Sequence, residues 1–371
     1  MQDIDLGTIR LTVVWAAFAI GLVLGAVMSR SNFCTMGAVA DIANMGDWTR
    51  MRMWLAAIGT AMAGTALLAA AGLIDPTRAL YATPNLAWLS YAVGGFLFGF
   101  GMVLAGGCGS RTLLRVGAGS LKSLVTFLVL GLSAYMTLKG LTGVLRANLL
   151  DPVALRLPVT QDLPSLVAAG DEAARDTWRL ALGLGLGGAL LAFALADREF
   201  RRPAPLLGSA LVGLCVVAGW IVSGHLGHLP EHPETLEEAF VGTNSGRMEA
   251  LSFVAPVAYL LELLMFWSDS SRVVTMGIAS TLGMIGGAFL VAITRREFRW
   301  EGFHGAEDTA NHVVGGALMG VGGVTALGCT IGQGLSGLSV LAAGSFIAFA
   351  AIVAGGFAAL RYQAWRVDRM G

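Results

Sequence analysis

Apolar runs long enough to cross a lipid bilayer recur along the whole of this 371-residue chain. Hydrophobic residues make up 56% of the sequence and charged residues only 13%. Soluble domains carry about 25% charged residues, whereas an unbroken apolar run of about 20 residues spans the hydrocarbon core as a helix. The sequence therefore predicts an all-α integral membrane protein, with one polytopic membrane domain over residues 1–371.

The apolar runs predict ten spanning helices. They cover residues 11–29, 52–73, 88–106, 120–141, 178–196, 206–224, 250–268, 273–294, 311–328 and 342–361. Residues 146–177 contain three prolines together with Asp and Arg, which predicts an extramembrane linker. We expect a first half at residues 11–141 and a second half at residues 178–361.

Segments 94–120 and 315–341 repeat one glycine-rich pattern. Shifted by 221 residues, they match at five glycine positions, including the pairs Gly107-Cys108 and Gly328-Cys329. In membrane proteins, glycine-interrupted apolar segments at corresponding positions of two halves point to a transport site near the bilayer midplane. The pattern predicts a duplicated membrane unit with a thiol at the same place in each half.

Glycines around the two cysteines predict breaks in the helices. Residues 105–109 and 328–334 are too glycine-rich for continuous helix, because each glycine costs about 1 kcal/mol relative to alanine. Broken backbone is tolerated at membrane depth only where it is buried in protein or lines a cavity. We therefore expect a site at the breaks, with short helices starting near Ser110 and Ile331.

A third break with its own cysteine is predicted directly after the first helix, at residues 30–37. Its counterpart in the second half, residues 251–258, is apolar apart from Ser252 and has no cysteine. The symmetry of the two halves is therefore expected to be incomplete.

Three of the four cysteines belong to these breaks. Cys34, Cys108 and Cys329 are flanked by Gly, Ser, Thr and Asn, whereas Cys215 lies in a plain apolar helix and is predicted to be a core residue. A neutral thiol is a weak donor and a polarizable contact, and helix N-termini attract anions. The three cysteines therefore predict a path for a soft, sulfur-bearing anion, although each thiol alone also fits close packing.

Polar and glycine residues beside the cysteines complete the predicted pathway. They are Asn32, Thr35, Gly107, Ser110, Arg111, Gly328, Thr330 and Gln333. We expect Arg111 to contact the anion, and Arg115 and Lys122 to anchor the surface. Glu262 lies in the middle of an apolar run, so it is a candidate intramembrane charge that faces the bundle interior.

Other classes of site lack support in the sequence. The net charge is zero and no basic tract is present, which argues against nucleic acid as a partner. His225, His228 and His232 precede three glutamates, but their spacing matches no zinc signature and their prolines indicate a loop. No P-loop, dinucleotide fingerprint or Ser-His-Asp arrangement is apparent, so we expect no catalytic residue, no metal and no cofactor.

Three motifs in order resemble those of the YeeE/YedE family of inner-membrane transporters, whose best-understood members take up thiosulfate. The motifs are S-R-S-N-F-C-T-M-G-A (29–38), G-G-C-G-S-R-T-L-L-R-V-G-A-G-S (106–120) and G-C-T-I-G-Q-G-L-S-G-L-S (328–339). The resemblance covers nearly the whole chain. It implies a pseudo-twofold, inverted-repeat fold of about nine to ten transmembrane helices, with short re-entrant helices pointing to the centre, in a bacterial inner membrane.

The resemblance also implies a function. Thiosulfate or a related sulfur-containing anion would pass between Cys34, Cys108 and Cys329 by transient thiol hydrogen bonds, without redox change. Some members pair with a soluble TusA-like sulfur carrier, and others are linked to selenium metabolism. Two alternatives stay open: a transporter of a selenium compound, and a membrane enzyme whose thiols exchange disulfides or persulfide, which the missing C-x-x-C pair disfavours.

Overall fold

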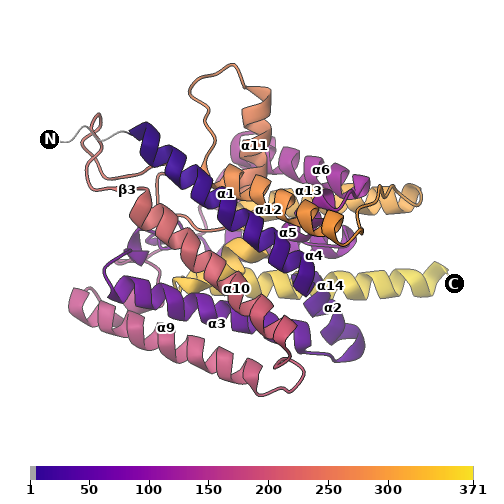
Figure 1. Cartoon of the computed structure of the whole chain (residues 1–371), viewed down its shortest axis with the longest axis horizontal. Coiled ribbons are helices and arrows are strands. Elements are labelled where there is room, and N and C mark those ends of the chain that lie inside the picture. The colour runs from indigo at the N-terminus through magenta and orange to yellow at the C-terminus, as the bar shows by residue number, and fades with distance from the viewer. Residues whose placement is uncertain (1–5, 371) are drawn as a thin grey trace.

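The computed structural model describes residues 6–370, and nearly all of its regular structure is helical (Figure 1). The α-helices are α1 (Leu6–Ser31), α2 (Thr35–Met45), α3 (Thr49–Ala70), α4 (Trp88–Leu104), α5 (Gly109–Gly117), α6 (Leu121–Lys139), α7 (Leu141–Leu149), α8 (Leu163–Ala168), α9 (Glu172–Leu195), α10 (Pro203–Ile221), α11 (Ala255–Met265), α12 (Met276–Thr294), α13 (Ala306–Thr325) and α14 (Ala343–Met370). Residues 1–5 and 371 of the predicted single domain lie outside the described part.

Short elements complete the described part. They are the 3-10 turn η1 (Pro76–Arg78), the π-helical turns η2 (Val222–Leu226) and η3 (Gly332–Gly337), and the strands β1 (Asn85–Leu86), β2 (Leu155–Arg156), β3 (His228–Leu229) and β4 (Ala239–Phe240). β1 pairs with β2 and β3 pairs with β4, both antiparallel.

Eight segments within residues 6–370 are long and apolar enough to cross a membrane. They are Leu6–Met45, Thr49–Ala70, Trp88–Gly117, Leu121–Lys139, Glu172–Leu195, Pro203–Leu226, Met276–Thr294 and Ala343–Arg369. The prediction of an all-α, multi-pass membrane protein is thus confirmed, with eight such segments where nine to ten were expected.

Two predicted spans account for the difference. Residues 250–268 form only α11, whose 11 residues extend about 16 Å at about 1.5 Å per residue, too short for a hydrocarbon core. Residues 311–328 belong to α13, which begins earlier than predicted and carries Glu307 and Asp308 in its first turn. Its hydropathy falls below that of a spanning segment, although it packs against α4 and α6.

The duplicated glycines lie where α4 and α13 cross in opposite directions. Gly94 contacts the backbone near Gly322 and Ala326, and Gly101 contacts Gly315. A Cβ at Gly322 would lie 2.5 Å from the Gly94 oxygen, so this crossing requires glycine. Small residues allow this close approach of backbones in membrane helices.

Equivalent elements pack in equivalent pairs around this crossing. α14 packs on α4 as α6 packs on α13, and α10 packs on α3 as α1 packs on α12. The short helices follow the same rule, since α2 contacts α3 and α14, whereas α11 contacts α12 and α6. These pairs support the two-repeat arrangement, whose boundaries at residues 11–141 and 178–361 stay a prediction. α9 has no such counterpart and lies at the edge of the bundle (Figure 1).

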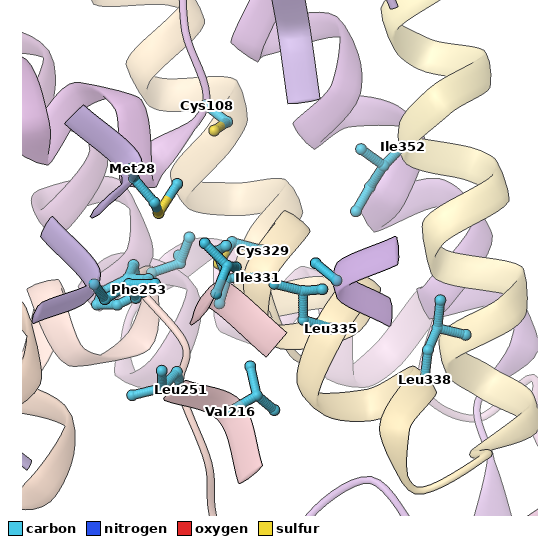
Figure 2. Packing of buried hydrophobic residues seen from close by; sticks show 14 of the residues in the cluster. Met28, Cys108, Val216, Leu251, Phe253, Cys329, Ile331, Leu335, Leu338 and Ile352 are labelled. Atoms are coloured by element: carbon cyan, nitrogen blue, oxygen red, sulfur yellow. The ribbon is translucent and has the colours of Figure 1, made fainter. Parts of the chain in front are cut away.

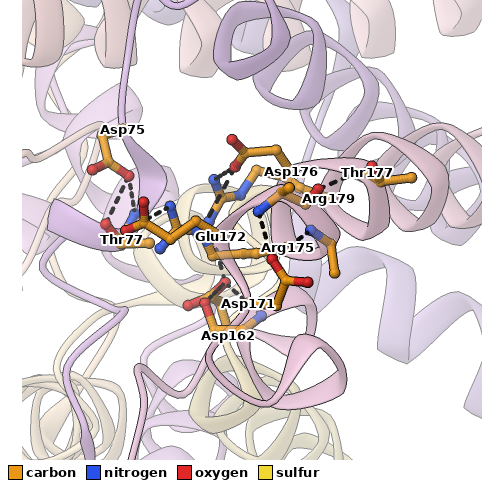
Figure 3. Close-up of polar contacts among 12 residues, drawn as sticks. Asp75, Thr77, Asp162, Asp171, Glu172, Arg175, Asp176, Thr177 and Arg179 are labelled. Atoms are coloured by element: carbon orange, nitrogen blue, oxygen red, sulfur yellow. Dashed lines mark hydrogen bonds and ion pairs between the residues drawn. The ribbon is translucent and has the colours of Figure 1, made fainter.

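The predicted linker, residues 146–177, contains α8 and contacts the membrane helices. Gln161 accepts from the Ala343 amide through its carbonyl oxygen, and Asp162 is fully buried. The Asp162 carboxylate caps α8 and lies 3.4 Å from the Arg179 guanidinium of α9 (Figure 3). This buried ion pair joins the linker to α9. Removing either partner would leave an unpaired buried charge, which is destabilising.

The glycine crossing predicts how alanine substitutions act. Gly322→Ala places a methyl group 2.5 Å from two backbone atoms of α4, at Gly94 and Phe98. We expect it to lower stability by about 1–3 kcal/mol and to lower the melting temperature of the detergent-solubilised protein. Gly185→Ala in α9, where a Cβ meets nothing within 4 Å, is the control and is expected to keep or raise the melting temperature. Equal melting temperatures for the two variants would contradict the described crossing.

Candidate functional site

The three predicted breaks are present, between α1 and α2, between α4 and α5, and between α13 and η3. Each contains a residue in the left-handed region: Asn32 (φ 53°), Gly106 (φ 67°) and Leu327 (φ 59°). Gly106 and Leu327 correspond under the 221-residue shift, so both halves turn in the same way. Leu327 adopts this conformation at a cost of about 1–2 kcal/mol, because its Cβ approaches the backbone.

Each cysteine lies where helical structure resumes after its break. Cys34 is the N-cap of α2, where its sulfur accepts from the Gly37 amide at 3.4 Å. Cys329 repeats this contact with the Gly332 amide at 3.5 Å, and Cys108 is the N-cap residue of α5. The breaks therefore turn three sulfurs toward the ends of new helical turns.

The three thiols lie together in the interior. They are free and buried, with exposed fractions of 6% for Cys34, 1% for Cys108 and 0% for Cys329. The Cys34 and Cys108 side chains lie close enough to interact, and Cys329 is close enough to Cys108 for a charge on one thiol to act on the other. Figure 2 shows Cys108 and Cys329 in one packed cluster. The structure thus brings together three residues separated by up to 295 positions in the sequence, from Cys34 to Cys329.

Hydroxyl groups surround the thiols. Ser110 Oγ lies 3.2 Å from the Cys108 sulfur. Thr35 and Thr330 are 1% and 0% exposed, and their hydroxyl oxygens have no hydrogen-bond partner, although Thr330 lies near the Cys108 thiol. A buried polar group without a partner costs about 1–3 kcal/mol. These two hydroxyls therefore have hydrogen-bonding capacity left for a ligand.

Gly107, Gly328 and Gln333 shape the breaks. A Cβ at Gly107 would lie 2.8 Å from the Arg111 side chain, and one at Gly328 would lie 3.2 Å from that of Gln333. The Gln333 amide nitrogen donates to the Ala326 carbonyl at 2.5 Å, and its oxygen accepts from Ser345. The side-chain nitrogen and oxygen of Gln333 are therefore both hydrogen-bonded and stabilise the break.

Three of the other predicted residues occupy distinct places. Arg111 is half-buried in the first turn of α5, close enough to Cys34 for its charge to act on that thiol. Asn32 is exposed at its turn. Glu262 is buried as predicted, 2.6 Å from the Lys139 ammonium and 3.1 Å from the Arg272 guanidinium.

The surface role expected of Lys122 is corrected by the structure. Lys122 is 8% exposed and pairs with Glu301 at 2.8 Å, because residues near 301 fold against the start of α6. This ion pair lowers the pKa of the Glu301 carboxyl. Arg115 is half-buried, and its guanidinium reaches the Gly106 carbonyl at 3.5 Å, so it supports the second break from outside.

A cavity of about 240 Å³ lies beside the cysteine cluster. Its wall includes Tyr81, Ser252 and Glu249. The Tyr81 and Ser252 oxygens are within 3.1 Å of a Cβ placed on Gly332, whose amide binds the Cys329 sulfur. The cavity therefore ends close to Cys329.

Sequence reasoning did not identify these cavity residues as part of the site. They belong to loops far apart in the chain, and only Ser252 gave a signal, as the one polar residue in the apolar counterpart of the first break. A second cavity, of about 320 Å³, shares the wall formed by Asn244 and Tyr259 and is lined by Lys139, Glu262 and Arg272. The charged side chains of the second cavity therefore lie next to the 240 Å³ cavity, which we call the inner cavity.

The loop that contains His225, His228 and His232 makes contacts with residues nearby in the sequence. His228 lies 2.6 Å from Glu238 and stacks on Phe240. Burial and the charge of Arg78 lower the pKa of His228. Within residues 6–370, no group of three His, Cys, Asp or Glu side chains is placed to hold a metal ion.

The sequence of this chain matches the sulphur transport family over residues 30–358, a range that contains all three cysteines of the motifs. The chain belongs to the sulphur transport family. This membership confirms the resemblance stated from the motifs and makes the protein a transporter rather than an enzyme.

Two relatives of this sulphur transport protein carry the name thiosulfate transporter TsuA. The one from Escherichia coli is 28% identical over 328 residues, which cover 85% of this chain and 84% of the relative. The one from Spirochaeta thermophila is 25% identical over 370 residues, covering 90% of this chain and 94% of the relative. The similarity therefore extends over most of the chain.

The unpartnered Thr330 hydroxyl predicts an unusual effect on stability. Thr330→Val replaces the hydroxyl with a methyl group of similar size, and we expect an unchanged or higher melting temperature, because no hydrogen bond is lost. Thr281→Val is the matched control: Thr281 is also fully buried, but its hydroxyl donates to the Gly277 carbonyl at 2.8 Å. The control is expected to lose about 1 kcal/mol. An equal loss in both variants would show that Thr330 has a structural partner.

Proposed function

We propose that this protein takes up thiosulfate or a related sulfur-containing anion across the bacterial inner membrane, with Cys34, Cys108 and Cys329 as successive contacts and no redox change. The proposal is carried by one observation: three buried, free thiols from three chain breaks lie together inside a protein of the sulphur transport family. Relatives from two bacteria that are named thiosulfate transporters supply further support.

The chemistry of the site suits a soft anion. A neutral thiol is a weak hydrogen-bond donor with a polarizable sulfur, so it contacts the terminal sulfur of thiosulfate without holding it tightly. The hydroxyls of Thr35, Ser110 and Thr330 are stronger donors for the anion's oxygens. The N-termini of α2 and α5 add positive backbone potential, and Arg111 adds a full charge near Cys34.

The order of the contacts follows from their neighbours. Cys329 lies next to the inner cavity, Cys108 lies near both other thiols, and the Arg111 charge acts on Cys34. We propose that the anion meets them in this order. A soluble TusA-like carrier as partner stays a prediction that rests on the family resemblance.

Single cysteine substitutions test the proposal. We expect Cys108→Ala and Cys329→Ala to lower uptake of labelled thiosulfate at least about tenfold, equivalent to about 1.4 kcal/mol, with normal amounts of protein in the membrane. Cys215→Ala is the control, because Cys215 is also buried but belongs to α10. Uptake is measured in cells that lack other sulfur routes, with sulfate, sulfite and selenium oxyanions as competitors.

Full uptake by Cys108→Ala would refute the role of the thiols. Stronger competition by a selenium oxyanion than by unlabelled thiosulfate would instead assign a selenium compound as the substrate.

A further inference from the structure

Glu249 is an acidic residue on the proposed path of an anion. Its side chain lines the inner cavity together with Tyr81 and Ser252, which lie beside the Gly332 amide that binds Cys329. Its backbone is held from both sides by the Ser223 hydroxyl. The Glu249 backbone is therefore held in the wall of a cavity that ends close to Cys329.

The Glu249 carboxylate is held by hydrogen bonds from Ser245 and the Asn244 backbone but not by a cation of the described residues. One of its oxygens accepts from the Ser245 amide at 2.7 Å, and no cation of residues 6–370 forms an ion pair with it. Arg146 also lines the cavity, but its guanidinium lies 3.0 Å from Asp151. A partly buried carboxylate without a cation is less favoured in its charged form than one in water.

The charged and titratable groups around Glu249 come from several elements. They are Tyr81 after η1, Arg146 in α7 and Tyr259 in α11, with Lys139, Glu262 and Arg272 behind Tyr259 in the adjoining cavity. Lys139 and Arg272 are both engaged by Glu262. Burial raises the pKa of Glu249, and the contacts with Ser245 oppose this shift only in part.

We propose that Glu249 takes up a proton when the sulfur anion enters the inner cavity. The inference rests on the proposed function, because a divalent anion there would meet a second negative charge if Glu249 stayed ionised. The proton comes from water on the side of the membrane to which the cavity opens, and it resides on a carboxyl oxygen of Glu249. No bond of the anion changes. The protonated carboxyl is also a hydrogen-bond donor, so it turns a repulsive group into a possible contact.

Thermodynamic linkage between proton binding and anion binding makes the proposal measurable. If protonation favours anion binding, anion binding favours protonation by the same factor. Above the pKa of Glu249, thiosulfate affinity is expected to fall about tenfold per pH unit, because one proton is bound with each anion. Below that pKa the affinity is expected to be constant.

Calorimetric titration of the purified full-length protein with thiosulfate tests this linkage, between about pH 6 and pH 9 and in two buffers of different ionisation enthalpy. The parent protein should take up one proton per anion at the alkaline end. Glu249→Gln, which mimics the neutral carboxyl, should bind thiosulfate with a constant affinity and without proton uptake. Glu237→Gln, the same change in an exposed loop, should behave like the parent.

The outcomes separate this inference from the proposed function. Binding without proton uptake in the parent, or undiminished pH dependence in Glu249→Gln, overturns the role of Glu249 while thiosulfate remains the ligand. A folded parent that binds no thiosulfate at any pH overturns the proposed function itself. Absence of proton uptake in the parent overturns the role of Glu249 even where Glu249→Gln does not fold.

Discussion

Backbone amide and carbonyl groups need hydrogen-bond partners wherever water is excluded, and this requirement organises the molecule. Three helices are interrupted near cysteines, and lipid could not satisfy the freed groups. The breaks are therefore enclosed by protein, and the glycine crossing of α4 and α13 lets their backbones approach closely. Partners come from the protein itself, as where Gln333 donates to the Ala326 carbonyl and Arg115 reaches that of Gly106.

The site is less symmetric than the helices around it. α2 and α11 hold equivalent positions in the packing, but Cys34 precedes α2 whereas Val254 precedes α11. A complete repeat would place a fourth thiol before α11, but an apolar side chain lies there instead. On that side lies the inner cavity with Glu249, and on the other side lies Arg111 near Cys34. An anion crossing the site would therefore meet different electrostatic surroundings at its two ends.

Features that depend on residues close together in the sequence could be predicted from it. The breaks, the grouping of Cys34, Cys108 and Cys329, and the core position of Cys215 follow from local glycine and polar patterns. The length of α11 did not follow, because residues 250–268 are apolar enough for a span and only their packing against α6 and α12 shows a short helix. Tyr81 and Glu249 were missed because loops far apart in the chain bring them to one cavity. Lys122 was misplaced for the same reason, since its partner Glu301 lies in a distant segment.

The central claim is that the anion passes whole between neutral thiols. The most direct measurement is uptake of thiosulfate labelled separately at its inner and its terminal sulfur, followed by intact-mass analysis of the protein after many turnovers. The account predicts that both labels enter in equal amounts and that all four cysteines remain unmodified. Selective entry of the terminal sulfur, or a persulfide on Cys34, Cys108 or Cys329, would contradict it and favour a thiol enzyme.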